Sequence, residues 1–185
     1  MNNNDTALLV IDIQDSFRID PARWAVRSTP RFEENVTNLL RLFRESGQPV
    51  IFVLHNDSDP GFRPGDPEVR LMGFLDRRDD EPLITKNTRN AFTSTDLKAR
   101  LDALGVRKLV ICGITTEQCC ETTTRVANDV FGYDVDFVSE ATMSFPIGSL
   151  AAEEIIRRTE AVLRGRIARI VTVAEIEEEV TASAT

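Results

Sequence analysis

Three nearly unbroken runs of apolar residues constrain the fold of this chain more than any other feature of its sequence. They are ALLVIDI at 7–13, PVIFVL at 49–54 and KLVIC at 108–112. Runs that are apolar at successive positions, rather than at alternate ones, are typical of strands buried on both faces of a parallel sheet. Further strands are expected at 133–138 and 169–173, and a short one at 83–85. The sequence therefore predicts a mostly parallel sheet of about six strands.

Apolar residues between these strands recur at helical spacing. Each of three such stretches ends shortly before a glycine, a common residue just beyond a helix C-terminus. They cover 32–43, 97–104 and 155–163. Strands that alternate with helices predict a three-layer α/β/α fold, with a Rossmann-like sheet and right-handed crossovers. A length of 185 residues suits a single domain that spans 1–185.

The charge balance and the cysteines restrict the partners and the compartment. Lys and Arg total 22 and Asp and Glu total 30, so the formal net charge is −8. An acidic chain without a basic stripe is a poor ligand for nucleic acid. No stretch approaches the ~20 apolar residues that cross a bilayer, and no basic segment typical of a signal peptide precedes the first apolar run. Three cysteines do not form a disulfide framework, which favours the cytoplasm.

Two segments have a less regular pattern. The stretch 56–82 is rich in Pro, Gly and Asp and lies between two expected strands. Loops of this length are usually functional or mobile, so it either shapes a pocket or is a solvated insertion, and both interpretations stay open. The acidic stretch 175–180 is expected to be a helical turn with a solvated face.

Three reactive side chains follow three different expected strands. Asp12 lies at the end of the first run, Lys86 follows the short strand at 83–85, and Cys119 comes after the turn GITTEQ, at the start of an expected helix. Ligands of parallel α/β sheets bind beyond the carboxyl ends of the strands. The three side chains can therefore meet in one site.

Such a trio has a clear chemical use. A cysteine attacks as the thiolate, which a helix N-terminus and a nearby ammonium both favour by lowering the thiol pKa. A carboxylate can take the thiol proton and return it to a leaving group. Taken singly, each residue more often has a structural role: Asp12 as a carboxylate that caps a turn, Lys86 as a surface lysine and Cys119 as a small buried hydrophobe.

Three motifs in order give this chain a family resemblance. ALLVIDIQDSF, ITKNTRNAFTSTDL and LVICGITTEQCCETTTRVANDVFGYDV resemble the isochorismatase-like cysteine hydrolase superfamily, and the β/α pattern agrees from about residue 6 to 176. The resemblance implies a catalytic triad of Asp12, Lys86 and Cys119. It also implies a cis peptide bond between Ile114 and Thr115, with the backbone N–H groups of Thr115 and Cys119 as the oxyanion hole.

The same resemblance separates the cysteines and argues against a metal. The spacing Gly-x-x-Thr-x-x-Cys begins at Gly113 and ends at Cys119, so Cys112 and Cys120 are interpreted as core residues. Nicotinamidases of the superfamily hold a metal with several histidines after the second strand, whereas this chain has only His55 there. We therefore expect no metal and no cofactor. His55 either lines the pocket or caps the strand.

The nucleophilic cysteine also narrows the reaction, because the true isochorismatases of the superfamily cleave a vinyl ether and lack it. The expected function is a cysteine amidohydrolase that cleaves a C–N bond of a small amide, carbamoyl, ureido or lactam compound through a thioester. The alternatives are an isochorismatase-type ether hydrolase and a non-catalytic binding or assembly protein on the same fold. Phe17 and Phe92 are candidate pocket walls, and Gln14 and Thr116 are candidate polar contacts to substrate.

The resemblance further implies a homo-oligomer, a dimer or a tetramer. Trp24, the only tryptophan, lies in the irregular segment 18–30. A large aromatic side chain in such a segment is more often packed than exposed. It can pack on its own chain or on a neighbouring subunit near the pocket.

Overall fold

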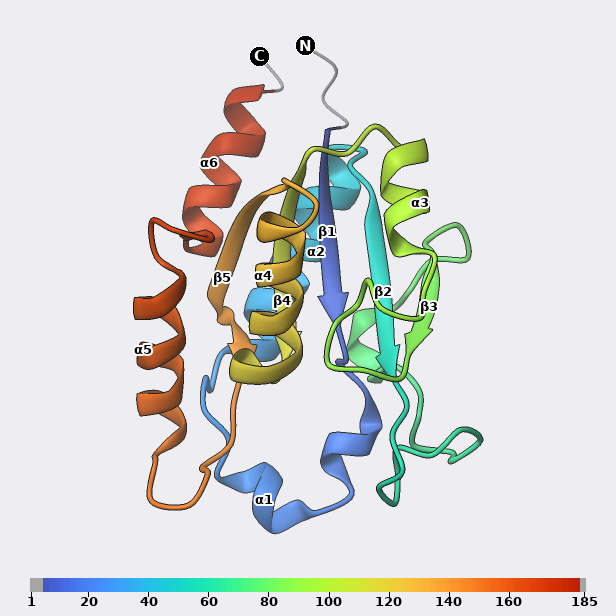
Figure 1. Cartoon of the computed structure of the whole chain (residues 1–185), viewed down its shortest axis with the longest axis vertical. Coiled ribbons are helices and arrows are strands. Elements are labelled where there is room, and N and C mark those ends of the chain that lie inside the picture. The colour runs from blue at the N-terminus through green and yellow to red at the C-terminus, as the bar shows by residue number, and fades with distance from the viewer. Residues whose placement is uncertain (1–4, 184–185) are drawn as a thin grey trace.

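A parallel sheet of six strands forms the centre of the molecule in the computed structural model, which describes residues 5–183 (Figure 1). The strands are β1 (Thr6–Ile11), β2 (Val50–His55), β3 (Leu83–Lys86), β4 (Lys108–Ile114), β5 (Asp134–Met143) and β6 (Arg169–Ile170). Their order is β3-β2-β1-β4-β5-β6, and every neighbouring pair is parallel. The predicted α/β fold with a Rossmann-like sheet is confirmed.

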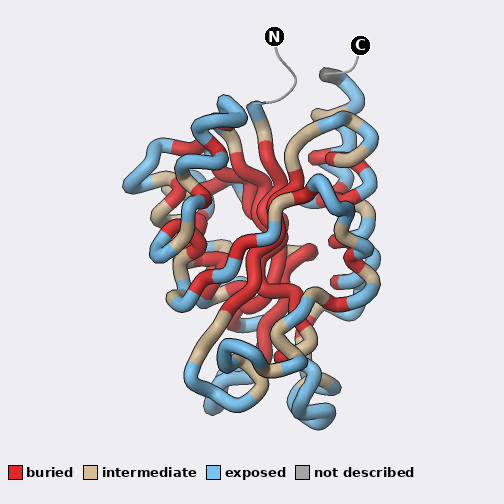
Figure 2. Tube along the Cα trace, turned by 90° about the vertical axis from the view of Figure 1, so that its right-hand side faces the viewer, coloured by how far each residue is buried: buried red, intermediate tan, exposed pale blue. Residues whose placement is uncertain are grey.

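Helices cover both faces of this sheet. They are α2 (Phe32–Glu45), α3 (Leu97–Ala103), α4 (Glu121–Asp129), α5 (Ala152–Leu163) and α6 (Val173–Ser183). The short α1 (Pro21–Ala25) lies beyond the carboxyl ends of the strands instead (Figure 1). Successive side chains of a strand point to opposite faces, so Leu8 packs in the core beneath α2 and α6, while Leu9 packs in the core beneath α3 and α4. Figure 2 shows the buried strands between two layers that are exposed on the outside.

The ends of several elements differ from the sequence prediction. β5 continues to Met143, five residues beyond the expected end, because a register shift against β4 between Ile111 and Gly113 lets the strand bend and pair again. β6 is only two residues long. The expectation of a merely solvated turn at 175–180 is wrong, since the stretch belongs to α6 and its Ile176 is buried in the core with α2.

The path of the chain creates a crevice between β1 and β4. The chain adds β2 and β3 on one side of β1 and then crosses to β4 on the other side. Ligand sites of such sheets lie at this reversal, beyond the carboxyl ends of the strands. Gly113 allows the two strands to approach there: its φ is +140°, and a Cβ atom would lie 2.0 Å from the carbonyl oxygen of Ile11.

The long segment 56–82 returns to the same end of the sheet. Its one regular element is a short 3-10 helix, η2 (Gly73–Leu75). The segment runs beside the residues that follow β1, where the N–H of Met72 donates to the carbonyl of Ile13 at 3.0 Å. Among residues 5–183, no helix is both long and apolar enough to cross a membrane.

Candidate active site

The structure brings Asp12, Lys86 and Cys119 together at the carboxyl ends of three strands. Asp12 follows β1, Lys86 is the last residue of β3, and Cys119 lies in the helical turn η3 (Thr116–Cys120) that connects β4 to α4. The Lys86 Nζ lies 2.6 Å from the Asp12 Oδ2 and 3.2 Å from the Cys119 Sγ. All three residues are buried. The lysine ammonium therefore contacts both the carboxylate and the sulfur.

The backbone at Asp12 is shaped for this position. Its φ of +54° lies in the left-handed region, which residues with a side chain seldom adopt. The Asp12 N–H still donates to the carbonyl of Val53 in β2 at 2.9 Å, so the residue stays attached to the sheet. Strained conformations of this kind concentrate at functional sites.

The turn that carries Cys119 presents backbone donors to the same site. The peptide bond between Ile114 and Thr115 is cis, where the family resemblance implied it. The Thr115 N–H donates to no acceptor within residues 5–183, and Thr115 borders a pocket together with Cys119. A backbone N–H without a partner in such a place is suited to bind a developing oxyanion.

The electrostatic environment of Cys119 differs from the sequence prediction. Burial raises the pKa of the Cys119 thiol, the charge of Asp12 raises it further, and the Lys86 ammonium only partly opposes both. The lysine lowers this pKa, as expected, but burial outweighs its effect, so the net shift is upward and not downward. Burial therefore favours the thiol form of Cys119, and a nucleophilic role for this side chain would require a proton acceptor.

Asp12 has an oxygen suited to accept that proton. Its Oδ2 is occupied by Lys86. Its Oδ1 is buried and has no hydrogen-bond partner among residues 5–183. An unsatisfied buried acceptor costs free energy, so its presence beside a buried thiol is consistent with a chemical role.

His55 is directed into the site rather than only capping its strand. Its Nδ1 lies 3.1 Å from the Lys86 Nζ. Burial, followed by the nearby Lys86 charge, lowers the pKa of His55 below its usual 6.5, so the ring is neutral at pH 7. Its Nε2 lies 2.7 Å from the Arg89 Nη1 and 3.2 Å from the Asp57 Oδ2, so each ring nitrogen lies beside a cationic donor.

An ion pair closes this network at the mouth of the pocket. The Arg89 Nη1 lies 2.7 Å from the Asp57 Oδ2, and the Arg89 Nε donates to the Gln118 Oε1 at 3.2 Å. Hydrogen bonding from Arg89 holds the pKa of Asp57 well below its usual range. Sequence reasoning missed all three residues, because Asp57 and Arg89 lie in irregular segments and Gln118 is one of the variable positions of the turn motif.

The pocket above Cys119 has a volume of about 170 Å³. Phe17, in the 3-10 turn η1 (Asp15–Arg18), forms one wall, as expected, and its ring packs edge-on against Phe62 with the centroids 5.1 Å apart. Phe62, Asp57 and Asp59 come from the segment 56–82. Of the two interpretations of that segment, the one in which it shapes a pocket holds for these residues.

Three other candidate contact residues do not line this pocket. Phe92 packs against Phe131, with the centroids 4.9 Å apart. Thr116 donates its hydroxyl to the Thr142 hydroxyl at 2.8 Å, inside the core. The Gln14 amide bonds to the backbone of His55, accepting from its N–H at 2.7 Å and donating to its carbonyl at 3.0 Å. These residues are close to the site residues in the sequence, but none of their side chains lines the pocket.

The two remaining cysteines lie in the cores, as expected. Cys112 and Cys120 are fully buried in the two cores, and burial raises the pKa of each thiol. Within residues 5–183, no three or more His, Cys, Asp or Glu side chains form a group that could hold a metal ion. His55 is poorly placed to be a ligand, because its Nδ1 faces the Lys86 ammonium.

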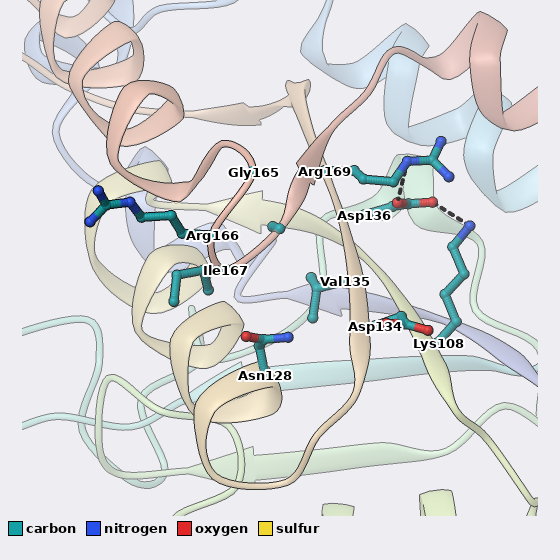
Figure 3. A pocket seen from close by; sticks show the side chains of 10 residues that line it. Lys108, Asn128, Asp134, Val135, Asp136, Gly165, Arg166, Ile167 and Arg169 are labelled. Atoms are coloured by element: carbon teal, nitrogen blue, oxygen red, sulfur yellow. Dashed lines mark ion pairs between the residues drawn. The ribbon is translucent and has the colours of Figure 1, made fainter.

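A larger cavity, of about 450 Å³, lies at the opposite end of the sheet near the first residues of β4 and β5 (Figure 3). The buried Asp136 in this cavity is paired with two cations: it lies 2.6 Å from the Lys108 Nζ and 3.3 Å from the Arg169 Nε. No cysteine or other strong nucleophile borders it. The pocket above Cys119 is therefore the candidate active site, although it is smaller.

Comparisons with known proteins agree with the fold and extend it to a family. The isochorismatase domain matches residues 6–172. The crystal structure of an isochorismatase-family protein from Chromobacterium violaceum superimposes with a TM-score of 0.89 and 29% identity, and the match covers 98% of this chain and 95% of that one.

Three relatives carry names that bear on the chemistry. YrdC of Bacillus subtilis, an isochorismatase family protein, is 33% identical over 141 residues, 75% of this chain and 74% of YrdC. Nicotinamidase 3 of Arabidopsis thaliana is 29% identical over 161 residues, 78% of this chain and 76% of that protein. Streptothricin hydrolase of Streptomyces noursei is 32% identical over 173 residues, 92% of this chain and 60% of that protein.

Proposed function

The chain belongs to the isochorismatase family of hydrolases, and from this premise we propose that it cleaves a C–N bond of a small amide, carbamoyl, ureido or lactam compound. Cys119 is the nucleophile, and the acyl group passes through a thioester. The observation that carries the proposal is the position of the Lys86 ammonium, 2.6 Å from the Asp12 Oδ2 and 3.2 Å from the Cys119 Sγ.

The first half of the reaction forms the thioester and releases the amine. Asp12 takes the proton of the Cys119 thiol as the sulfur attacks the carbonyl carbon. The carbonyl oxygen becomes an oxyanion, and the backbone N–H groups of Thr115 and Cys119 stabilise it. When the tetrahedral intermediate collapses, the C–N bond breaks and the nitrogen leaves with the proton from Asp12.

The second half regenerates the enzyme. Asp12, again a carboxylate, takes a proton from a water molecule as that water attacks the thioester carbonyl. The C–S bond breaks, the sulfur recovers the proton, and the carboxylic acid leaves. Lys86 remains an ammonium throughout and stabilises the negative charge on Asp12 and on the sulfur in turn.

The raised pKa of Cys119 supports an acid–base partner. A thiol that is buried and protonated at neutral pH needs a base at the moment of attack. Asp12 lies next to the same ammonium and has an unpartnered oxygen. The relatives named as a nicotinamidase and as a streptothricin hydrolase support cleavage of a C–N bond rather than of an ether.

A panel of small amides, ureides and lactams, scored by the release of ammonia or acid, tests the proposal. We expect turnover of at least one class by the wild-type chain and none by Cys119→Ala. Cys120→Ala is the matched control, because Cys120 is adjacent, buried and assigned to the core. If isochorismate is the only substrate turned over, and Cys119→Ala turns it over equally well, the ether hydrolase is correct and our proposal is wrong.

A further inference from the structure

Arg23 is a cationic side chain at the candidate active site that lacks a counter-charge. Arg23 of α1 borders the pocket above Cys119. The other arginine there, Arg89, is paired with Asp57 at 2.7 Å. The Arg23 guanidinium forms no ion pair or side-chain hydrogen bond with any residue between 5 and 183, and its one recorded side-chain contact is with an aromatic ring.

That ring holds the guanidinium in place. The Arg23 Cζ lies 4.3 Å from the centroid of Phe145. Phe145 is buried and packs nearly parallel to Phe17, the wall of the pocket, with 6.1 Å between the centroids and 17° between the planes. Trp24, half-buried, packs on the same Phe145 at 6.4 Å, so it contacts its own chain. A flexible side chain is therefore positioned by a rigid aromatic cluster.

A stacked guanidinium is suited to bind a carboxylate. Its N–H donors lie in the plane of the group, so stacking leaves them available at the edge, where two parallel hydrogen bonds to a carboxylate can form. The chain has a formal net charge of −8. An unpaired cation at the pocket therefore has the opposite sign to the net charge of the protein. It would attract an anion locally.

We propose that Arg23 is the specificity residue of this pocket and binds a carboxylate of the substrate, so that the substrate class is a small amide or ureide with a carboxylate at the end remote from the scissile bond. This inference rests on the proposed function for the identity of the reacting end. The carboxylate contact itself depends only on the pocket.

Asp59 is the alternative charge that a substrate could meet. It borders the same pocket and forms no ion pair within residues 5–183. A carboxylate in that place would select an ammonium group instead of an anion. No aromatic stack positions Asp59 as Phe145 positions Arg23, which is why we assign the selectivity to Arg23.

Binding to Cys119→Ala, measured by calorimetry, tests the assignment without turnover. The ligands are malonamate, succinamate and glutaramate, which carry a carboxylate, succinamide, which is neutral, and β-alaninamide, which carries an ammonium. Arg23→Met and Arg23→Lys are compared in this background. Arg27→Met is the matched control, because Arg27 stacks on Trp24 at 4.5 Å and does not border the pocket.

We expect at least one of the three carboxylates to bind more tightly than succinamide. Arg23→Met should weaken that binding about tenfold or more, the range of a charge-assisted hydrogen bond. Arg23→Lys should recover part of the affinity, since it keeps the charge but loses the paired donors. Arg27→Met and Asp59→Asn should not weaken it.

Three results would overturn the assignment: no carboxylate binds, carboxylates bind no better than succinamide, or β-alaninamide binds best and loses affinity in Asp59→Asn. The proposed function is judged separately from turnover. Cys119-dependent hydrolysis of neutral amides without carboxylate preference would leave the function standing and remove the role of Arg23. Arg23-dependent binding of carboxylates without hydrolysis of any amide would support the role of Arg23 and contradict the proposed function.

Discussion

The ammonium of Lys86 and the carboxylate of Asp12 are 2.6 Å apart, and both side chains are completely shielded from solvent. Ion pairs in such a place seldom add stability over an apolar pair, but removing one partner leaves an uncompensated charge. A buried pair that also contacts a cysteine sulfur is therefore better explained by chemistry than by stability.

Replacing Lys86 with Met removes the charge and keeps most of the side-chain volume. We expect Cys119 alkylation to shift to higher pH, because the ammonium lowers the pKa of this thiol, and turnover to fall by about two orders of magnitude or more. The free energy of unfolding should fall by about 3–5 kcal/mol, the cost of breaking a buried pair. Alkylation rates, turnover and urea unfolding measure the three effects.

The control for this variant is a second pair of proteins. Asp12→Asn and Asp12→Asn/Lys86→Met differ only in the ammonium. Asp12 could take up a proton when Lys86 is replaced, and this pair removes that effect because residue 12 carries no charge in either protein. An alkylation profile that is unchanged in both comparisons, together with normal turnover by Lys86→Met, would mean that Lys86 has no part in the reaction.

His55 gives the protein a pH dependence that can be isolated. It is the only histidine in the chain, and burial lowers its pKa below 6.5 in the folded state. As the pH falls, His55 is therefore protonated in the unfolded state before it is protonated in the folded state. The contribution of the neutral ring to the free energy of unfolding is fully present above about pH 6.5 and is lost as the pH falls towards the folded pKa. We expect the free energy of unfolding to drop between pH 7.5 and 5.5 in wild type.

The matched variant is His55→Gln, which removes the titrating ring. Its unfolding free energy should change less over the same interval, since the carboxyl groups with lowered pKa values titrate further towards acid. Equal pH slopes in urea titrations of the two proteins would show that His55 is not buried in its neutral form.

Gln14 is expected to act as a positioning residue for His55. Gln14→Leu leaves the His55 N–H and carbonyl without these partners, and each lost hydrogen bond of a buried group costs about 1–3 kcal/mol. Turnover should fall together with stability. Asn35→Ala is the control. Asn35 lies on α2, and its side-chain amide donates a hydrogen bond to the Glu140 carbonyl at 2.6 Å, so this variant also removes a bond between an amide side chain and the backbone. If both variants lose stability but keep the same kcat and the same pH profile, Gln14 has only a structural role.

Assembly into a homo-oligomer remains a prediction from the family resemblance. The faces around α1 and the segment after β5 carry apolar side chains that a partner could cover: Ile19, Val26, Ile147 and Leu150 are 48%, 57%, 48% and 53% exposed. Light scattering at micromolar concentration should give a multiple of the chain mass of 20.7 kDa. A mass of a single chain would contradict the prediction.

The residues that meet at the site could be identified from sequence for a physical reason. Asp12, Lys86 and Cys119 each follow a buried strand, and the carboxyl ends of parallel strands share one edge of the sheet. The continuous apolar runs that reveal these strands are the strongest periodic signal in the chain. What the sequence could not give was the net effect on the thiol pKa, which depends on how completely water is excluded.

The pocket wall was harder to predict, because its residues lie on irregular segments. Arg23, Asp57 and Arg89 have no periodic pattern that fixes their direction, and only the folded path brings them to Cys119. Gln14 and Phe92 were assigned to the pocket from their place in the motifs. A position within a motif shows which residues are near one another in the sequence. Whether the side chain points into the pocket depends on the local turn of the backbone.

The most direct test of the account is hydroxylamine trapping of the acyl group on a substrate identified by the panel. A thioester on Cys119 should be attacked by hydroxylamine in competition with water. The wild-type chain is expected to release hydroxamate in proportion to the hydroxylamine added, and Cys119→Ala is expected to release none. Release of the carboxylic acid alone at every hydroxylamine concentration, or an equal yield of hydroxamate from Cys119→Ala, would contradict a covalent intermediate on this cysteine.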